Sequence, residues 1–228
     1  MLSNLWETLL DFLFPPHCPR CGAYVERRGG WCPACLQQTA LWRQLALPSQ
    51  SPLTAAWAVG HYRGGLRDLI RGLKYHGRRA SLPYIRSVLA TVPAGWFGRL
   101  TGTAAAASWL AVPVPLFPAK ERQRGFNQTE LMFRDWLAAQ GIPLARLLVR
   151  TRATRPQFGL DRAARRANLR GAFALAPDAA AALAGRDVLL LDDIYTTGTT
   201  ADTCAACLLT GGARRVVLLA LASDHAPY

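Results

Sequence analysis

Two adjacent acidic residues, Asp192 and Asp193, stand between the apolar run VLLL at 188–191 and the polar run IYTTGTT at 194–200. Because each carboxylate accepts hydrogen bonds, the pair can bind two neighbouring hydroxyl groups of one ligand. If a helix begins within the polar run, its free backbone N–H groups and positive dipole end can bind a phosphate. The combination predicts a site for a sugar phosphate such as ribose 5-phosphate. An ordinary strand–turn–helix connection with an acidic N-cap is the alternative.

The predicted phosphate-binding segment follows the two acids directly. Gly198 allows the backbone to approach a ligand closely, and the threonine hydroxyls around it add hydrogen-bond donors. We expect the helix to begin near Thr199, because Thr199 and Asp202 have a spacing like that of a capping box. The residues of this segment expected to line the ligand site are Tyr195, Thr196, Thr197, Gly198, Thr199 and Thr200, with the phosphate at 196–200.

Four of the six cysteines form two Cys-x-x-Cys pairs, CPRC at 18–21 and CPAC at 32–35. Each pair can present two thiolates, and the glycines at 29–30 can reverse the chain between the pairs. Four thiolates in one place are typical of a structural zinc site. Disulfide pairing is the alternative, which a reducing cytoplasm disfavours. The predicted zinc ligands are Cys18, Cys21, Cys32 and Cys35.

A third Cys-x-x-Cys pair, Cys204 and Cys207, lies within an expected helix among alanines and leucines. With no second pair nearby to complete a metal site, we interpret both as small buried side chains. A redox-active pair is the alternative, although no thioredoxin-like context precedes it.

The chain has 228 residues and a net charge of +13, and the excess positive charge is clustered. Between Arg146 and Arg170 there are eight arginines and one acid, Asp161. Such blocks attract polyanions, either nucleic acid or a multiply phosphorylated small molecule. A solvated surface that binds nothing is the alternative, although such a surface usually mixes both signs of charge.

The N-terminal segment 1–14 is apolar at helical spacing, which predicts a short helix that docks on the protein. It lacks a basic leader and a cleavage site, so we do not interpret it as a signal peptide. No apolar run reaches the roughly 18 residues that a membrane span requires. These features lead us to expect a cytoplasmic protein.

Strand and helix patterns alternate along most of the chain, which predicts an α/β fold with a parallel sheet flanked by helices. A small N-terminal four-cysteine knuckle precedes it. We expect two domains, 1–47 with the helix and knuckle and 53–228 with the sheet, joined by a Pro- and Ser-rich linker at 48–52. The strands expected are 56–62, 108–115, 187–194 and 214–222, and the later helices 65–77, 81–92, 127–141 and 199–212.

The segment VLLLDDIYTTGTT closely resembles the loop of type I phosphoribosyltransferases that binds 5-phosphoribosyl 1-pyrophosphate (PRPP). Four further features resemble the ComF family of competence proteins, so the resemblance covers nearly the whole chain. They are LKYHGR at 73–78, VPVP followed by KERQRGFNQTELM within 112–132, RPQFGLDRAARRANLRGAF at 155–173, and the four-cysteine knuckle.

The resemblance implies that Mg²⁺-bound PRPP lies across the strand ends. Asp192 and Asp193 would bind the ribose hydroxyls, and residues 196–200 the 5-phosphate. Arg122 or Arg124 would neutralise the departing pyrophosphate. The arginine-rich segment 150–170 would form a mobile lid or bind nucleic acid, through the side chains of Arg155, Arg162, Arg165 and Arg166.

One position departs from purine-using relatives, in which a carboxylate often follows the second acid by three residues. Here that residue is Thr196, whose hydroxyl cannot accept a proton at pH 7 as a carboxylate can. This favours an ammonia-like acceptor, or no catalysis, over a nucleobase reaction.

Three functions follow from the resemblance: a phosphoribosyltransferase of the glycosyltransferase class, a DNA-uptake accessory, or a PRPP sensor without turnover. The accessory would bind single-stranded DNA and work with a competence helicase. Aromatic residues near basic ones could stack on bases, although packing is the more common role of such residues. They are Trp31, Trp42, Trp57, Tyr62 and Tyr75.

Overall fold

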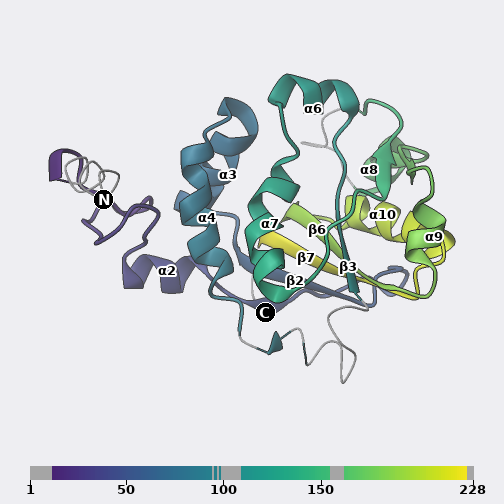
Figure 1. The fold of residues 1–228 in the computed structure, drawn as a ribbon, viewed down its shortest axis with the longest axis horizontal. Coiled ribbons are helices and arrows are strands. Elements are labelled where there is room, and N and C mark those ends of the chain that lie inside the picture. The colour runs from purple at the N-terminus through teal and green to yellow at the C-terminus, as the bar shows by residue number, and fades with distance from the viewer. Residues whose placement is uncertain (1–11, 94, 97, 99–108, 155–161, 225–228) are drawn as a thin grey trace.

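The computed structural model describes residues 12–93, 95–96, 98, 109–154 and 162–224. A five-stranded sheet in the order β1-β2-β7-β6-β3 forms its centre (Figure 1). Strand β1 is antiparallel to β2, and the other neighbours are parallel, as the sequence predicted. The strands are β1 (Arg43–Gln44), β2 (Ala55–His61), β3 (Trp109–Pro113), β6 (Asp187–Tyr195) and β7 (Arg215–Ser223).

Helices cover both faces of this sheet (Figure 1). The first face packs against α3 (Gly64–His76), α4 (Leu82–Leu89) and α7 (Gln128–Gln140). The second face packs against α8 (Arg162–Leu169), α9 (Ala179–Leu183) and α10 (Thr199–Thr210). None of the helices in the described residues is long and apolar enough to cross a membrane.

Alternating side chains of the central strands build these two core layers. In β6, Leu189 and Leu191 pack on the first face, whereas Val188 and Leu190 pack on the second. This follows from strand geometry, in which successive side chains point to opposite faces of the sheet. Because both faces are buried, β6 is a continuous apolar run rather than an alternating one.

The carboxyl end of β6 extends beyond its neighbour β3. The β3–β6 register ends at Pro113↔Leu191, whereas the β6–β7 register continues to Tyr195↔Ser223. Residues 192–195 therefore have a strand partner on one side only. This leaves the two acids at an open edge, where ligands bind in parallel α/β sheets.

A second, two-stranded antiparallel sheet of β4 (Leu148–Arg150) and β5 (Phe173–Leu175) lies against α10. The predicted lid connects these two strands. Its residues 155–161, including Arg155, lie outside the described residues. Arg162, Arg165 and Arg166 belong to α8, so the C-terminal part of the basic stretch is a helix, which the sequence analysis did not anticipate.

Helices α6 (Pro118–Arg124) and α9 and the short β1 were also not predicted. For α6 the signals were present in the sequence. Pro118 occupies the first turn, where its missing N–H costs nothing. Gly125 ends the helix with φ of 81°, a left-handed conformation that favours glycine. The predicted N-terminal helix falls mainly on residues 1–11, which lie outside the described residues.

The four-cysteine knuckle packs against α3 and α4. Its Trp31 and Val25 belong to the same core layer as Ile85. The indole Nε1 of Trp31 donates a hydrogen bond to the Tyr84 carbonyl at 3.0 Å. Helix α2 (Pro33–Thr39) follows the last cysteine pair. The knuckle thus shares its apolar core with the α/β part of the chain.

Candidate functional site

The carboxylate of Asp193 joins three elements at the open edge of the sheet. It lies on β6 and is buried, with 6% of the residue exposed. Lys74 Nζ of α3 donates to Asp193 Oδ1 at 2.7 Å, and Gln128 Nε2 of α7 donates to Asp193 Oδ2 at 2.6 Å. Both oxygens of this buried carboxylate are therefore occupied by protein donors.

Gln128 extends the chain of contacts from Asp193 to a further cation. Its Oε1 atom accepts a hydrogen bond from Arg124 Nη1 at the end of α6. A flipped amide would place two donors together and two acceptors together, so this orientation is the only one that satisfies both neighbours. Lys74, Asp193, Gln128 and Arg124 thus form one connected row across α3, β6, α7 and α6.

Asp192, the neighbouring acid, is in a different environment. Its Oδ1 accepts a hydrogen bond from the backbone N–H of Asp193 at 2.8 Å. Within the described part of the chain, no lysine or arginine forms an ion pair with it. Burial, with a further contribution from the Asp193 carboxylate, raises the pKa of Asp192 to about 8.

A cavity of about 350 Å³ lies at this edge, and both acids line it. Four cations also line it: Lys74, Lys120, Arg124 and Arg150. Burial lowers the pKa of Lys120, and the positive charges of Arg124, Arg150 and Lys74 lower it further. The cavity therefore concentrates more positive than negative charge, as a site for a polyanion requires.

The predicted phosphate-binding segment adjoins this cavity through Thr196 and Thr200. Gly198 has φ of 77° and immediately precedes α10. A Cβ atom at Gly198 would lie 2.6 Å from the Tyr195 hydroxyl oxygen, so a side chain is excluded here. The turn thus requires glycine both for its backbone conformation and for its close packing.

The predicted capping box at Thr199 is wrong. Gly198 is the N-cap residue, and no side chain caps the helix. The Thr199 hydroxyl lies 3.0 Å from that of Thr197, while Asp202 Oδ1 accepts a hydrogen bond from Ser51 Oγ at 2.6 Å. The Asp202 carboxylate therefore binds the linker instead of the helix end.

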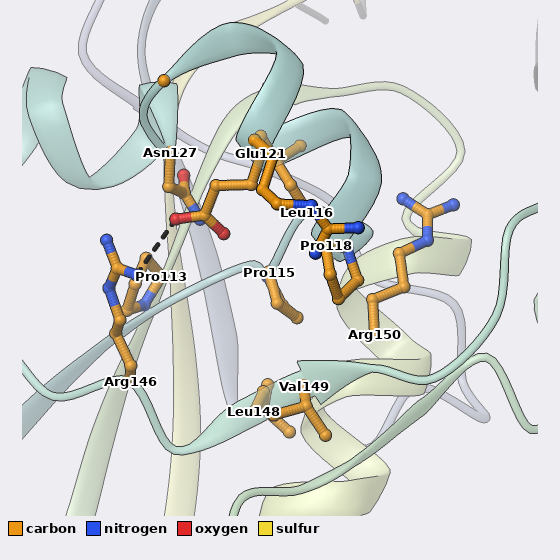
Figure 2. A pocket seen from close by; sticks show the side chains of 12 residues that line it. Pro113, Pro115, Leu116, Pro118, Glu121, Asn127, Arg146, Leu148, Val149 and Arg150 are labelled. Carbon is orange, nitrogen blue, oxygen red and sulfur yellow. Dashed lines mark hydrogen bonds and ion pairs between the residues drawn. The ribbon is translucent and has the colours of Figure 1, made fainter.

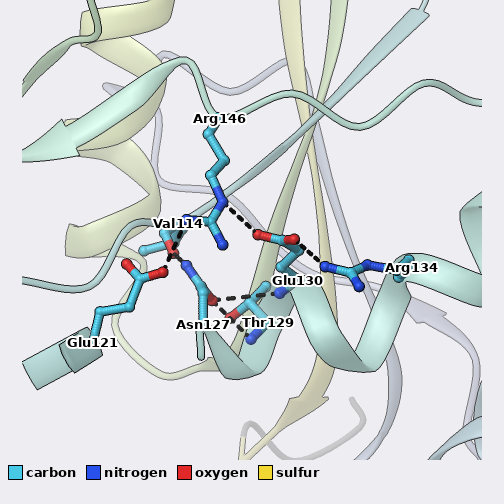
Figure 3. A network of polar contacts seen from close by, with 7 residues as sticks. All are labelled: Val114, Glu121, Asn127, Thr129, Glu130, Arg134 and Arg146. Atoms are coloured by element: carbon cyan, nitrogen blue, oxygen red, sulfur yellow. Dashed lines mark hydrogen bonds and ion pairs between the residues drawn. The ribbon is translucent and has the colours of Figure 1, made fainter. Parts of the chain in front are cut away.

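The residues around the RGFNQ motif fix the start of α7 (Figure 3). Asn127 Oδ1 accepts hydrogen bonds from the backbone N–H groups of Thr129 and Glu130, and Asn127 Nδ2 donates to the Val114 carbonyl at 3.0 Å. This capping arrangement ties α7 to the end of β3. It places Gln128, the next residue, against Asp193.

Glu130 anchors the same region by ion pairs (Figure 3). Arg146 Nε donates to it at 2.7 Å, and Arg134 pairs with its other oxygen. Arg146 also pairs with Glu121 of α6 at 3.0 Å. Although burial opposes ionisation, the hydrogen bonds from Arg146 and Arg134 lower the pKa of Glu130.

Arg122 lies at a different cavity from Arg124. This second cavity, of about 460 Å³, is lined by Arg122. Pro115, Leu148 and Arg150 line it as well (Figure 2). It shares Arg150 and Pro115 with the cavity that contains the acids. Of the two arginines expected to neutralise pyrophosphate, the structure places Arg124 beside the acids and Arg122 on the neighbouring surface.

A third cavity, of about 400 Å³, adjoins the first, with which it shares Lys74, Tyr75, Lys120 and Arg124. Tyr75 is 66% exposed. The other aromatic residues considered for base stacking are largely packed. Trp31 is buried, Trp42 and Trp57 stack on each other at 4.9 Å, and Tyr62 is half-buried.

The cysteines of the two N-terminal pairs converge as predicted. The four sulfur atoms of Cys18, Cys21, Cys32 and Cys35 all lie within 4.8 Å of one another. This arrangement fits tetrahedral coordination of one zinc ion by thiolates. By contrast, Cys204 is buried on α10 and Cys207 is half-buried beside it, which agrees with their interpretation as packing residues.

Comparison with known proteins places the chain. Residues 9–46 match the model of the double zinc ribbon domain. Across 87% of the chain and 80% of the relative, the sequence is 32% identical to the DNA utilization protein YhgH of Escherichia coli strain K12. Competence protein F of Haemophilus influenzae is 29% identical, over 91% of this chain and 84% of that protein. The chain belongs to the ComF family.

The matched segment 9–46 of this ComF family chain contains four cysteines, which suffice for one tetrahedral zinc site. Among solved structures, a phosphoribosylpyrophosphate synthetase from Mycobacterium smegmatis is 16% identical with a TM-score of 0.34, covering 58% of this chain and 34% of that one.

The sequence analysis assigned no role at the predicted ligand site to three cations of the cavity that the two acids line: Lys74, Lys120 and Arg150. Lys74 and Lys120 fall within LKYHGR and KERQRGFNQTELM, so the resemblance marked their segments without assigning roles. Arg150 stands at the end of β4, with its guanidinium 5.4 Å from the centre of the Phe173 ring. Its position beside Asp192 depends on how the small sheet packs.

Proposed function

We propose that this chain binds Mg²⁺-complexed PRPP at the carboxyl edge of the sheet and transfers its phosphoribosyl group to an acceptor, with release of pyrophosphate. One observation carries the proposal: a single cavity combines two acidic side chains with four cations, and it adjoins the glycine–threonine turn before α10 through Thr196 and Thr200. PRPP presents vicinal hydroxyls, a pyrophosphate and a 5-phosphate on one ring. Each part of that ligand has a chemical counterpart in the cavity.

The 5-phosphate would bind at residues 196–200, where backbone N–H groups and the dipole of α10 favour an anion. The ribose would lie over the end of β6, and the pyrophosphate near Lys74, Lys120 and Arg124. Arginine suits the pyrophosphate because it binds bidentately and keeps its charge. Mg²⁺ bound with PRPP would neutralise part of the pyrophosphate charge, and carboxylate oxygen such as that of Asp192 suits that ion.

In the transfer, the bond from C1 of the ribose to pyrophosphate breaks, and pyrophosphate departs with the electron pair. A lone pair of the acceptor forms the new bond to C1, and the acceptor loses a proton to solvent. Thr196 supplies no carboxylate base at the expected position. The acceptor is therefore proposed to be a nucleophile such as ammonia, which needs no such base for its attack.

Calorimetric titration with Mg²⁺-PRPP tests the binding step. Lys74→Met should weaken binding about ten- to a hundredfold, because a charge-assisted contact to phosphate is lost. Arg67→Met, on the same helix but outside the cavity lining, is the matched control and should bind as the wild type does. A wild-type chain without measurable affinity for PRPP would refute the proposal.

Pyrophosphate release then separates enzyme from sensor. Release should be measured with ammonia, nucleobases and single-stranded DNA as trial acceptors, each against a reaction without acceptor. Acceleration by one of them supports the transferase. PRPP binding with no release from any acceptor contradicts the transferase and supports a PRPP-sensing regulator.

A second candidate function is single-stranded nucleic-acid binding, in keeping with the words DNA utilization and competence in the relatives' names. Its support is Tyr75, an exposed aromatic ring among Lys74, Lys120 and Arg124. Bases stack on such rings while cations bind the phosphates. A DNA-uptake role with a competence helicase as partner belongs to this candidate, as does a cytoplasmic location.

Oligonucleotide titration over a range of salt concentrations tests this second candidate. Tyr75→Ala should weaken binding about ten- to a hundredfold, by the loss of one stacked base. Tyr24→Ala is the matched replacement on the knuckle, where Tyr24 is 65% exposed. Weakening by Tyr24→Ala alone would assign the nucleic acid to the knuckle. A triple replacement of Arg162, Arg165 and Arg166 by alanine tests the predicted basic lid in the same assay and should flatten the salt dependence.

Structural zinc completes the proposed function. The knuckle is too small to fold by apolar burial alone, so metal binding should supply its folding energy. Metal analysis of protein purified without chelator should find about one zinc per chain. Recovery of the folded chain without zinc would refute the site.

A further inference from the structure

We propose that the two adjacent acids have different tasks, an inference that rests on the proposed PRPP site. Asp192 binds the ribose hydroxyls. Asp193 is a positioning residue that holds Lys74 and Gln128, and through Gln128 also Arg124, in the wall of the cavity. The tasks differ from those the sequence suggested, in which both carboxylates bind the sugar.

Strand geometry separates the two side chains. Asp192 continues the alternation of Val188 and Leu190, which pack on the face of α10, whereas Asp193 continues that of Leu189 and Leu191. Asp193 accordingly contacts α3 and α7 on the first face. On the second face, burial raises the pKa of Cys204 in α10, and the negative charge of Asp192 raises it further. Neighbouring positions in one strand therefore place the carboxylates in different surroundings.

Asp193 is committed to protein contacts. One of its oxygens accepts from Lys74 Nζ and the other from Gln128 Nε2, at 2.7 and 2.6 Å. Its side chain is 8% exposed and that of Lys74 is 16% exposed, so solvent screens this ion pair little. A ribose hydroxyl would have to compete with a partly buried ammonium and an amide for these oxygens.

Asp192 is the acid that remains available at the ligand side. It lines both the cavity of the four cations and the small pocket formed by residues 194–201, whereas Asp193 lines only the former. A ligand whose 5-phosphate binds at residues 196–200 thus meets Asp192 next. Apart from the backbone contact from Asp193, no hydrogen bond to the Asp192 carboxylate occurs among the described residues.

The contacts of Asp193 instead determine where two cations stand. Lys74 and Arg124 come from helices separated in sequence by β3, and both point at the cavity through the row that includes Asp193 and Gln128. Pre-positioned cations bind a phosphate without the cost of ordering long side chains. Asp193 should therefore affect the pyrophosphate end of PRPP rather than its sugar.

Ribose 5-phosphate, which has the sugar and 5-phosphate but no pyrophosphate, is the probe that divides these tasks. We expect Asp192→Asn to bind it about ten- to a hundredfold more weakly than Asp193→Asn does. Both replacements remove one negative charge at neighbouring positions, so their long-range effects on an anionic ligand cancel in the comparison. Titrations at pH 8.5 keep the wild-type Asp192 carboxyl largely ionised.

A double-mutant cycle on Mg²⁺-PRPP affinity tests the positioning role. The effects of Lys74→Met and Asp193→Asn on the dissociation constant should depart from additivity by about tenfold or more, because Asp193→Asn acts through Lys74. Lys74→Met and Asp192→Asn should combine within about threefold of additivity. Lys74→Arg should retain most of the PRPP affinity, because it keeps the positive charge at the cavity. If Lys74 served only to pack the helix, affinity would not follow the charge at this position.

Equal weakening of ribose 5-phosphate binding by the two asparagine replacements would overturn the division of tasks while leaving the PRPP site in place. Additive behaviour of Lys74 and Asp193 would overturn the positioning role. Absence of binding of either ligand to the wild type would overturn the proposed function and this inference with it. Thermal unfolding of each variant identifies one that has lost its fold, and Lys74→Gln, which also removes the charge, then replaces Lys74→Met in the cycle.

Discussion

Strand β6 begins with Asp187 and reaches Asp192 five residues later, and the two carboxylates differ in their partners. Asp187 is fully buried and accepts hydrogen bonds from Arg214 Nε at 2.7 Å and Arg214 Nη2 at 2.6 Å, with Arg215 at 2.9 Å. Although burial opposes ionisation, these hydrogen bonds lower the pKa of Asp187. At Asp192, burial without such partners raises the pKa to about 8.

The difference shows how one strand serves two purposes. At its amino end, Asp187 fastens β6 to the arginines at the start of β7, which stabilises the sheet. At its carboxyl end, Asp192 forms no ion pair with a lysine or arginine of the described residues, so burial raises its pKa and its ionised form costs stability. A strongly shifted carboxyl at a cavity is characteristic of a binding or catalytic site.

The largest expected effect comes from breaking the amino end. Asp187→Asn should lower the free energy of unfolding by about 3 kcal/mol, the low end for breaking a buried ion pair, because both arginines are partly exposed. Urea denaturation at pH 7 measures this. Asp178→Asn, an exposed aspartate, is the control and should change stability by less than about 0.5 kcal/mol. A similar stability in both variants would contradict a fastening role for Asp187.

Ligand binding should sharpen the contrast between the two ends. Mg²⁺-PRPP at a hundred times its dissociation constant should stabilise the wild type by about 2.7 kcal/mol. The same stabilisation is expected for Asp187→Asn, because that residue lies at the opposite end of β6. At the same ligand concentration, Asp192→Asn should show a clearly smaller increase in melting temperature. Equal increases in melting temperature in all three proteins would contradict a contact between Asp192 and the ligand.

A smaller effect is expected from neutralising the carboxyl end. Without ligand at pH 8, Asp192→Asn should raise the free energy of unfolding by about 1–2 kcal/mol, since it removes a charge that burial disfavours. The effect is modest because Asp192 is partly exposed at the cavity, where solvent screens its charge.

The pH dependence gives the sign of that effect. Between about pH 4 and pH 8 the unfolded chain has released the Asp192 proton while the folded chain retains it. The folded state therefore binds more protons, and wild-type stability from this group falls as pH rises. Urea denaturation at pH 5, 7 and 8 should show the gain from Asp192→Asn growing with pH. A gain that is constant from pH 5 to 8 would contradict the raised pKa.

The smallest expected effect concerns the stability of the fold at acidic pH. Asp187 has a lowered pKa, so its stabilisation is present above the pKa of the unfolded carboxyl, near 3.8, and is lost as pH falls below it. Between pH 5 and pH 3, Asp187→Asn should lose about 1 kcal/mol less stability than the wild type. Parallel acid titrations of stability for the two proteins would show that Asp187 does not contribute.

Much of the frame was predictable from sequence because its signals are local. The apolar run before the acids, Gly198 in its turn and the two cysteine pairs each depend on residues within a short segment. The parallel sheet follows from the alternation of strand and helix patterns. Local reasoning failed where context competed with it, as at Asp202, whose carboxylate binds Ser51 of the linker rather than the helix end.

The division between the two acids was decided only by tertiary structure. Lys74 and Gln128 are 119 and 65 residues from Asp193 in sequence, and no local pattern specifies that both donate to it. The sequence by itself determined that two acidic residues would stand at the end of a buried strand, before a glycine- and threonine-rich turn into a helix. Which of them is occupied and which remains available depends on the helices packed on each face of the sheet, because burial and ion pairing are set by neighbours in space.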